Sequence, residues 1–405
     1  MAWIDPDRAL ELVLEHTSAG TVREVRLEDA CGLVLAEDVA CDRDYPPFAR
    51  AMMDGYAVRL ADAGRAVPVR GMVAAGQDSQ TLRQGVEAGY AVEIMTGAPC
   101  PPGSEAVVMY EETARDGDTV QLPRIVRAGQ HIARKGSDCA ASSVVIQAGQ
   151  ALTALGVAAL ASFGRSAARV FAPPSLAIIV TGNEIVSKDG TAGAFEMRDA
   201  NGPMLATQVR DLGLVAALDS ARDSVEAIEQ ALARAAQADI ILFSGGVSAG
   251  RYDLVPGALA GLGAKVIFRG VAQKPGKPLL FARMDRRLVF GLPGNPLGSH
   301  FCFHRYVAAS IRKWMGLVPS GAGGMARLAS PLEGLPERFL FQPARVELDK
   351  SGEDGVTRWR ATPSGTSSSA DLFSAATSNA YLYLRPGERA HADTDVAFEW
   401  IGGAR

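Results

Sequence analysis

Three segments rich in glycine and proline carry the residues best suited to bind an anionic small molecule. They are SGGVSAG at residues 244–250, KPGKP at 274–278 and GLPGNP at 291–296. Each lies where a buried strand would end, which is the edge where open α/β sheets bind ligands. Glycines let backbone N–H groups approach an anion, and helix N-termini add a favourable dipole. Because Lys274 and Lys277 add positive charge, the pattern predicts a site for a phosphorylated or otherwise anionic molecule.

Each segment taken alone also has a purely structural explanation. A glycine-rich loop serves any tight turn, prolines stiffen a turn, an asparagine caps a helix, and KPGKP is also typical of a solvated hairpin. A binding site is favoured because the three segments occur together, in register with the predicted strand ends. The residues predicted to contact the ligand there, besides the two lysines, are Ser244, Gly245, Gly246, Ser248, Gly250, Pro293, Gly294, Asn295 and Pro296.

Three carboxylates fall at strand ends or loops of the same predicted sheet. Glu184 follows the apolar run 176–180, Asp223 lies where a helix should begin, and Asp253 follows the glycine loop. Carboxylates beside a phosphate site commonly hold Mg²⁺, a hard cation that prefers oxygen ligands. They are therefore predicted metal ligands. The alternative is that Asp223 caps its helix and Glu184 is solvated.

Two other groups of potential ligands favour structural roles. His300 and His304 would share one helix face, but no HExxH glutamate accompanies them, and a packed pair is favoured over a metal site. The cysteines are scattered, odd in number and without CxxC spacing, which predicts reduced thiols in a cytosol rather than a disulfide framework or a zinc site. They are Cys31, Cys41, Cys100, Cys139 and Cys302.

Composition bounds the class of protein. The chain has 405 residues, 48% hydrophobic and 21% charged, which suits a globular protein of two to four domains. A net charge of −4 gives no sign of a nucleic-acid or membrane-surface partner. No apolar run reaches the roughly 18 residues that span a bilayer, and the N-terminus lacks the pattern of a signal peptide. We therefore expect a cytoplasmic protein.

The elements that must position these residues follow from hydrophobic periodicity. Residues 175–315 alternate strands and helices, which predicts a parallel sheet covered on both faces. Punctuated short runs over 39–146 predict β structure, as do the runs after residue 320, which indicate a small C-terminal β domain. A glycine-rich linker is expected at 316–324. The predicted helices lie at 6–14, 27–35, 152–163, 203–212, 224–236 and 297–314.

Seven motifs in this order resemble the MoeA family of molybdopterin molybdenumtransferases, which includes the E domain of gephyrin. The resemblance spans residues 5–400 and rests on MMDGYAV (52–58), EIMTGAP (93–99), RKGSD (134–138), VTGNEI (180–185), SGGVSAGRYD (244–253), KPGKP and GLPGNP. It implies an α/β domain of molybdopterin-binding type, β-rich N-terminal domains and a C-terminal β-barrel. The implied domains are 1–45 with 140–174, 46–139, 175–317 and 325–405.

The family resemblance also implies a reaction. Adenylylated molybdopterin and molybdate bind, Mg²⁺ assists, the phosphoanhydride is cleaved, AMP leaves and molybdenum enters the dithiolene. Lys274, Lys277 and the glycine-loop backbone would hold pyrophosphate and pterin. The three carboxylates would organise Mg²⁺. The resemblance implies a homodimer in which the partner subunit supplies residues of the β-domain motifs, while Ser369 matches the family's C-terminal serine. The partner's implied residues correspond to Asp54, Thr96 and Asp138.

Departures from the family pattern keep other functions open. The chain has Ala49, Arg50 and Ala51 where the family commonly has a more polar run, and Asn183 where it usually has aspartate. The alternatives are a molybdopterin-binding paralogue or scaffold without metal insertion, a tungstate-preferring homologue, and a molybdopterin adenylyltransferase. A molybdopterin adenylyltransferase and apo-molybdoenzymes are possible protein partners of the predicted enzyme.

Overall fold

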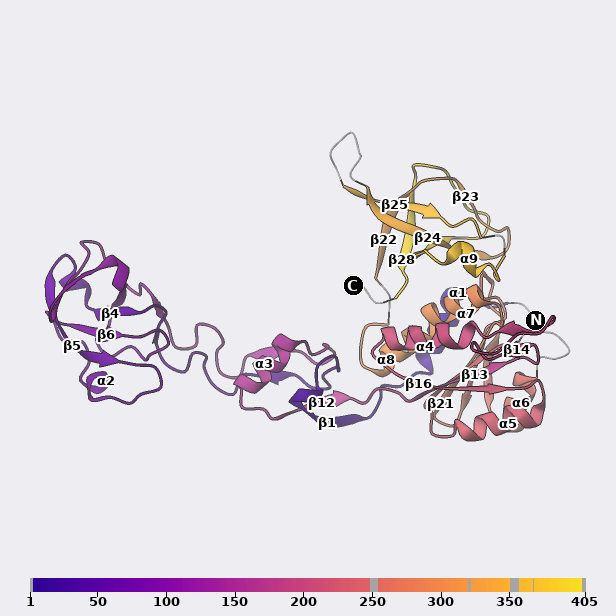
Figure 1. The fold of residues 1–405 in the computed structure, drawn as a ribbon, viewed down its shortest axis with the longest axis horizontal. Helices are drawn as coiled ribbons and strands as arrows, with labels where there is room; N and C mark the ends of the chain where they lie inside the picture. The colour runs from indigo at the N-terminus through magenta and orange to yellow at the C-terminus, as the bar shows by residue number, and fades with distance from the viewer. Residues whose placement is uncertain (1–2, 248–253, 320–321, 350–356, 367, 403–405) are drawn as a thin grey trace.

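The chain forms an elongated molecule with a β-rich body at one end and a larger α/β body with a β-barrel at the other (Figure 1). A slender middle region connects the two. The computed structural model describes residues 3–247, 254–319, 322–349, 357–366 and 368–402. Within these residues no helix has the length and apolar character needed to cross a membrane. The multidomain α/β and β architecture predicted from the sequence is confirmed.

A six-stranded sheet forms the centre of the α/β body, in the order β16-β13-β17-β21-β20-β18. The first four strands are parallel, as predicted, and β20 and β18 continue the sheet in antiparallel pairing. Only two residues join β20 to β21, and such a short turn connects antiparallel strands alone. The strands are β13 (Leu176–Thr181), β16 (Ala216–Ala221), β17 (Ile240–Ser244), β18 (Lys265–Arg269), β20 (Leu280–Met284) and β21 (Arg287–Leu292).

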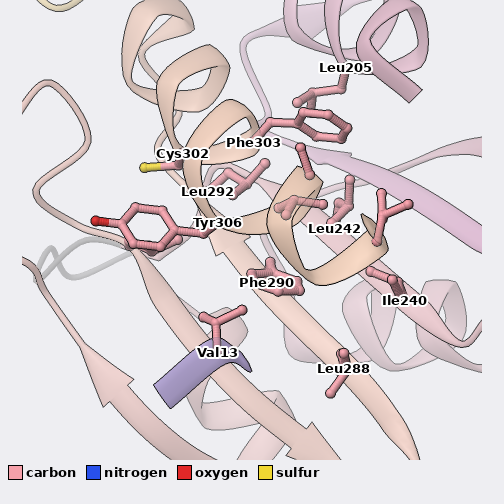
Figure 2. Packing of buried hydrophobic residues seen from close by; sticks show 14 of the residues in the cluster. Val13, Leu205, Ile240, Leu242, Leu288, Phe290, Leu292, Cys302, Phe303 and Tyr306 are labelled. Carbon is pink, nitrogen blue, oxygen red and sulfur yellow. The ribbon is translucent and has the colours of Figure 1, made fainter. Parts of the chain in front are cut away.

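Helices cover both faces of this sheet. One face packs in a core cluster that Figure 2 shows, with Leu242 and Phe290 of the strands against Phe303, Tyr306 and Val13 of the helices. The other face packs against α5 and α6. The predicted long helix near residue 300 forms as two α-helices joined by a π-helical turn at Phe303–Val307. The helices are α1 (Pro6–Glu15), α4 (Asn201–Asp211), α5 (Val225–Arg234), α6 (Val255–Gly261), α7 (Pro296–Cys302) and α8 (Ala308–Trp314).

The C-terminal strands close into a barrel, because β24 pairs with both β25 and β26. The short strand β19 (Gln273–Lys274) pairs in parallel with the start of β24. This pairing fastens the predicted lysine segment to the barrel. The barrel strands are β22 (Gly323–Leu328), β24 (Phe339–Asp349), β25 (Arg358–Pro363), β26 (Ala380–Leu384) and β28 (Asp395–Trp400), with β23 (Leu332–Glu333), β27 (Arg389–Ala390) and α9 (Leu372–Ala375) beside them.

The N-terminal part of the chain supplies the middle region and the far β-rich body. In the middle region β1 (Val22–Arg26) pairs with β12 (Ala167–Phe171) beside α3 (Ala154–Ser162). The far body holds a six-stranded sheet, here called the distal sheet, in the order β7-β4-β6-β5-β9-β8. Its strands are β4 (Gly55–Val58), β5 (Ala66–Val73), β6 (Ala91–Ile94), β7 (Ala106–Met109), β8 (Ala114–Asp116) and β9 (Thr119–Gln121), with α2 (Gln80–Gln84) packed against β5.

Short strand pairs complete the connections. β3 pairs with β10 and β2 with β11 along the chain segments that lead to the distal sheet, and β14 pairs with β15 beside the α/β sheet. These strands are β2 (Val39–Ala40), β3 (Arg50–Ala51), β10 (Ile132–Ala133), β11 (Val144–Ile146), β14 (Ile185–Val186) and β15 (Met197–Arg198).

The helix predicted at residues 27–35 is wrong beyond its first turn. A single 3₁₀ turn covers Leu27–Asp29, and Gly32 then adopts a φ of 83°, a left-handed conformation that ends the turn. The backbone of the following residues bonds to the chain before α3: Leu35 donates to the Gln150 carbonyl at 3.0 Å. The apolar residues that suggest a helical face pack instead in the core of the middle region.

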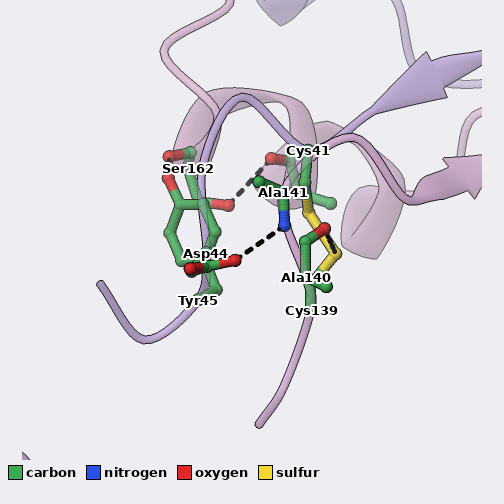
Figure 3. The surroundings of a disulfide bond; sticks show 8 residues. Cys41, Asp44, Tyr45, Cys139, Ala140, Ala141 and Ser162 are labelled. Carbon is green, nitrogen blue, oxygen red and sulfur yellow. Dashed lines mark hydrogen bonds between the residues drawn. A yellow bond between two sulfur atoms is a disulfide. The ribbon is translucent and has the colours of Figure 1, made fainter. Parts of the chain in front are cut away.

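The prediction that all cysteines are free thiols is wrong for two of them. Cys41 and Cys139 form a disulfide, shown with its surroundings in Figure 3. It lies where the two chain segments that lead to the distal sheet meet, since Tyr45 and Cys139 pair through their backbones. The Ala141 amide donates to Asp44 at 2.9 Å beside it. A spacing of 98 residues carries no local sequence signal, so this pair was not recognised.

Candidate functional site

A cleft of about 1020 Å³ lies at the carboxyl ends of β13, β17 and β21. It forms at this edge because the parallel strands end there and their loops turn outward. The three glycine- and proline-rich segments meet in it. The sequence-predicted residues that line the cleft are Glu184, Asp223, Ser244, Gly245, Gly246, Lys274, Lys277, Pro293, Gly294, Asn295, Pro296 and Ser369. Ser248, Gly250 and Asp253 lie outside the described residues.

The glycine loop after β17 needs its glycines to turn into the cleft. Gly245 has a φ of 100° and Gly246 a φ of 67°. A Cβ on Gly245 would lie 2.8 Å from both the carbonyl oxygen and Oγ1 of Thr181, which is closer than side-chain carbons approach such atoms. The loop is held to the neighbouring strand because the Gly245 amide donates to the Leu292 carbonyl at 3.1 Å. This fixed backbone at a strand end is suited to an anionic ligand.

Asn201, at the start of α4, joins two of the loops and was missed by the sequence prediction. Its Nδ2 donates to Oγ of Ser244 at 2.9 Å and to the Gly294 carbonyl at 2.7 Å. Its Oδ1 is buried with no hydrogen-bond partner among the described residues. The available signal was the polar run before Pro203, since the helix begins two residues earlier than predicted. Asn201 thus sets the separation of the loops that follow β17 and β21.

The acidic residues of the cleft follow β13 and β16. Asn183 and Asp223 bond reciprocally: the Asn183 amide donates to Asp223 Oδ2 at 3.2 Å, and the Asp223 amide donates to Asn183 Oδ1 at 3.1 Å. The alternative in which Asp223 caps the following helix is wrong. Ser224 caps α5 by accepting a hydrogen bond from the Ala227 amide. Asp223 therefore belongs to the cleft wall, and Asn183, which departs from the family pattern, holds it there.

The carboxylates present fit an Mg²⁺ ion that is shared with a substrate. Glu184 is exposed to the cleft, and Asp199 and Asp223 line it. Among the described residues no group of three His, Cys, Asp or Glu side chains is gathered closely enough to hold a metal, and the third predicted ligand, Asp253, is outside them. Mg²⁺ is typically held by one or two carboxylates, with substrate phosphates and waters filling its other positions. The donor set suits that arrangement.

The lysine segment KPGKP (residues 274–278) is held by buried polar contacts and is not a solvated hairpin. Gln273 is fully buried, accepts from the Tyr306 hydroxyl at 2.5 Å and donates to the Gly276 carbonyl at 3.2 Å. Gly276 has a φ of 87°, and a Cβ there would lie 2.5 Å from Sγ of Cys302. These contacts support the loop in the conformation that places Lys274 half-buried and Lys277 exposed along the cleft.

The barrel closes the cleft through Ser369. Its Oγ accepts a hydrogen bond from Nδ2 of Asn295 at 3.1 Å, and its carbonyl accepts from the Leu297 amide at 3.2 Å. The side chain of Asn295 makes no capping bond to α7, so the capping role considered from the sequence is wrong. Arg338, from the segment before β24, and Arg198 of β15 add two further cations to the cleft lining, and both were missed.

The predicted N-terminal site residues lie far from this cleft in the same chain: Asp54 and Thr96 are at the ends of distal-sheet strands, and Asp138 precedes Cys139 in the segment that returns from the distal sheet. Asp54 precedes β4 and Thr96 follows β6, and both strands are labelled in the far body of Figure 1. Asp54 Oδ1 accepts from the Thr96 amide at 2.7 Å and from its hydroxyl at 2.8 Å. These bonds hold the pKa of Asp54 below its ordinary value. Asp138 bonds to Arg50 at 3.4 Å, so the altered residue before β4 has an acidic partner.

His300 and His304 lie between α7 and the barrel. Nδ1 of His300 is 2.7 Å from the Tyr381 hydroxyl, and Nε2 of His304 is 3.6 Å from Glu399. Burial lowers the pKa of His300 to about 4, with a contribution from the neighbouring His304. Both rings also stack at a tilt near Tyr381. The pair packs the interface between the two domains, as the packed alternative predicts.

Two protein-family models match the chain, one over its N-terminal region and one over the α/β body. Residues 4–164 match the model of the MoeA N-terminal region (domain I and II), and residues 177–313 match the probable molybdopterin binding domain. Molybdopterin molybdenumtransferases of Staphylococcus epidermidis and Staphylococcus aureus are 28% and 29% identical to the chain. The alignments cover 93% and 94% of this chain and 90% and 91% of the relatives.

Solved structures agree along the whole length. A molybdopterin biosynthesis MoeA protein from Pyrococcus horikoshii is 27% identical, with a TM-score of 0.84 and complete coverage of both chains. A second structure of that protein gives a TM-score of 0.80, with coverage of 98% of this chain and 100% of the other. The fold agrees with these solved structures over the whole chain. The chain therefore belongs to the MoeA family of molybdopterin molybdenumtransferases and is a transferase enzyme.

Proposed function

We propose that this transferase inserts molybdenum from molybdate into adenylylated molybdopterin, with Mg²⁺-dependent release of AMP. The observation that carries the proposal is the single cleft in which lysines, a glycine loop and carboxylates meet at the carboxyl edge of the sheet. A substrate with a phosphoanhydride and a second oxyanion needs cations, backbone donors and oxygen ligands for a divalent metal in one place. The cleft supplies all three.

The lysines, the glycine loop, the prolines and Ser369 have different roles in the proposed reaction. Lys274 and Lys277 neutralise the negative charge of the phosphates and of molybdate, and the backbone of Gly245 and Gly246 offers room for an anion to approach. As the phosphoanhydride is cleaved, negative charge accumulates on the leaving AMP, and fixed cations stabilise it without reorganising. Pro293 and Pro296 keep the opposing loop rigid, and Ser369 contacts it from the barrel.

Glu184 and Asp223, with Asp253, would hold Mg²⁺ beside the anhydride. When bound, the ion supplies Lewis-acid charge stabilisation on phosphate oxygens. Asn183 would keep Asp223 oriented toward the cleft through their two reciprocal bonds. The replacement of aspartate by Asn183 thus leaves a positioning role at that site.

Asp54, Thr96 and Asp138 would act from the partner subunit of a homodimer. In one chain Asp54 and Thr96 flank β4 and β6 of the distal sheet and Asp138 precedes Cys139, and the elongated shape separates the distal sheet from the cleft (Figure 1). Two copies related by a twofold axis and lying antiparallel would bring each distal sheet beside the other's cleft, so that one closed dimer has two identical sites. The hydrogen bonds from Thr96 lower the pKa of Asp54 and so favour its ionised form.

The experiment combines purified protein, adenylylated molybdopterin, Mg²⁺ and micromolar molybdate. It measures AMP release and reconstitution of a molybdenum-free apoenzyme, as expected of a cytoplasmic cofactor-maturation enzyme. Molybdate-dependent AMP release with reconstitution supports the proposal. Binding of the pterin without AMP release contradicts it and favours a scaffold, and release that depends on tungstate instead favours a tungstate enzyme. ATP-dependent adenylylation of free molybdopterin would identify an adenylyltransferase.

A further inference from the structure

The segment Gly270–Ala272 beside the cleft bonds to two parts of the chain that are remote in sequence and to the nearby Lys277. Ile4 pairs with it from the N-terminus: its amide donates to the Gly270 carbonyl at 3.1 Å, and the Ala272 amide donates to the Ile4 carbonyl at 2.8 Å. The Val271 amide donates to the Lys277 carbonyl at 2.8 Å. The start of β24 joins as well, since the Phe339 amide donates to the Ala272 carbonyl at 2.9 Å.

These backbone bonds bring Trp3, Lys277 and Arg338 together, here called the Trp3 cluster. Nζ of Lys277 lies 4.6 Å from the centroid of the Trp3 ring, and Cζ of Arg338 lies 5.9 Å from it. Both distances are within the range of cation–π attraction. Lys277 and Arg338 line the cleft, so the indole contacts two of its cations from outside.

The backbone is shaped to admit the indole. Gly270 has a φ of 87°, and a Cβ there would lie 3.1 Å from Cδ1 of Trp3 and 3.9 Å from the Lys277 carbonyl oxygen. A Cβ at this position would crowd the Trp3 ring, whereas its distance from the Lys277 oxygen is an ordinary contact. Trp3 nevertheless stays 46% exposed, so burial of apolar surface does not by itself account for its fixed place. What the ring gains here is contact with the two cations.

The consequence concerns the charge at the cleft mouth. Two like charges held near each other repel, and a flexible lysine would otherwise spread over several rotamers before an anion arrives. An aromatic face attracts both cations electrostatically and leaves their charge available to an anion, whereas a carboxylate would neutralise it. Within the described residues no acidic side chain forms an ion pair with Lys277 or Arg338.

We propose that Trp3 is a positioning residue that holds Lys277 and Arg338 ready to bind the phosphate groups of the substrate. The inference rests on the proposed function only for the identity of the substrate, since the cluster would favour any anion that enters the cleft. Trp3 acts through the two cations. Its contribution belongs to binding, because it fixes charges that are needed before the reaction begins.

The test uses the full-length protein and two replacements of Trp3 that separate its properties. Trp3→Phe keeps an aromatic face, whereas Trp3→Leu keeps apolar bulk without one. Binding of inorganic pyrophosphate and of AMP is measured by titration calorimetry at low salt. We expect Trp3→Leu to weaken binding by about two- to fivefold, the range of exposed cation–π pairs, and Trp3→Phe to recover most of the affinity. Equal affinities of the two variants, or no loss in either, would overturn the proposal.

Two further readouts exclude a merely structural role. In the background of Lys277→Met the Trp3→Leu effect should shrink, because the main charge that the ring holds is gone. In turnover, the loss should fall on KM for adenylylated molybdopterin rather than on kcat. An unshifted thermal midpoint in Trp3→Leu shows that folding is intact. AMP release by the unsubstituted protein tests the proposed function separately, so its failure would leave the anion-binding result interpretable.

Discussion

At the scale of single residues, the cleft depends on side chains that connect its loops. Asn201 is the clearest case, because one buried amide serves two loops that come from different strands. Its hydrogen bonds to residues distant in sequence also explain why it could not be predicted from the sequence. Asparagine near a helix start is usually a cap, and nothing in the local sequence indicates a bond to Gly294, 93 residues away.

Replacing Asn201 with leucine should reduce activity more than stability. The change removes both donors and leaves the Gly294 carbonyl and Ser244 hydroxyl without this partner, a loss on the order of 1–3 kcal/mol. The loops would then separate, and affinity for pyrophosphate should fall. Gln208→Leu is the matched control, because Gln208 lies on the same helix and bonds to the His300 carbonyl away from the cleft. Equal loss of affinity in both variants would contradict a specific role for Asn201.

The hydrogen bonds from Thr96 make a prediction about pH. Both bonds favour the charged form of Asp54 and lower its pKa. Thr96→Val removes the hydroxyl bond and keeps the amide bond, so the pKa of Asp54 should rise toward its ordinary value of 3.8. If the ionised form is required, the acid limb of the pH–activity profile should move to higher pH, with the neutral plateau unchanged. An unmoved acid limb would show that Asp54 ionisation does not limit activity.

At the scale of elements, loop conformation in the cleft is set by what lies beneath the loops. Gly276→Ala should be strongly destabilising, because its Cβ would lie 2.5 Å from buried Cys302 Sγ and its φ is 87°. Gly213→Ala is the control, since Gly213 has a φ of 77° but no atom within 4 Å of the place that a Cβ would occupy. Backbone strain of about 1–3 kcal/mol acts at both positions, and overpacking adds to it at Gly276 alone. Thermal and urea unfolding of both variants measure the difference.

Most strands and helices could be predicted from the sequence, but the contacts among them could not. The strands β6 and β7 form within the stretch 39–146 that predicts β structure, because apolar runs bounded by turn residues leave little choice. The helix predicted at 27–35 failed because Gly32 and long-range pairing outweigh apolar spacing. Ser369 reaches the cleft through barrel closure, and Arg338 through β19 pairing, which are tertiary effects. The four domain boundaries and the roles of the site residues stay predictions.

At the scale of the whole molecule, the distal sheet is separated from the cleft. This separation makes it possible to test whether each site is shared between two subunits of a dimer. Asp54→Asn and Lys277→Ala should each abolish activity when pure, because each removes one half of every site. After subunit exchange, a mixed dimer has one site with both changes and one with neither. Random exchange of equal amounts should then restore about a quarter of the activity. No recovery despite demonstrated exchange would place both residues in a site within one chain, or one of them outside any site.

The Cys41–Cys139 disulfide makes the intervening chain a closed covalent ring that contains the whole distal sheet. A protease that cuts once inside the ring, for example in the loop between β8 and β9, would leave every residue attached to the rest of the molecule. The nicked protein should migrate as one species on a denaturing gel without reductant and as two fragments with it. Fragments that part without reductant would show that the thiols are free. The ring also means that the segment carrying Asp54 and Thr96 survives such cleavage as part of the enzyme.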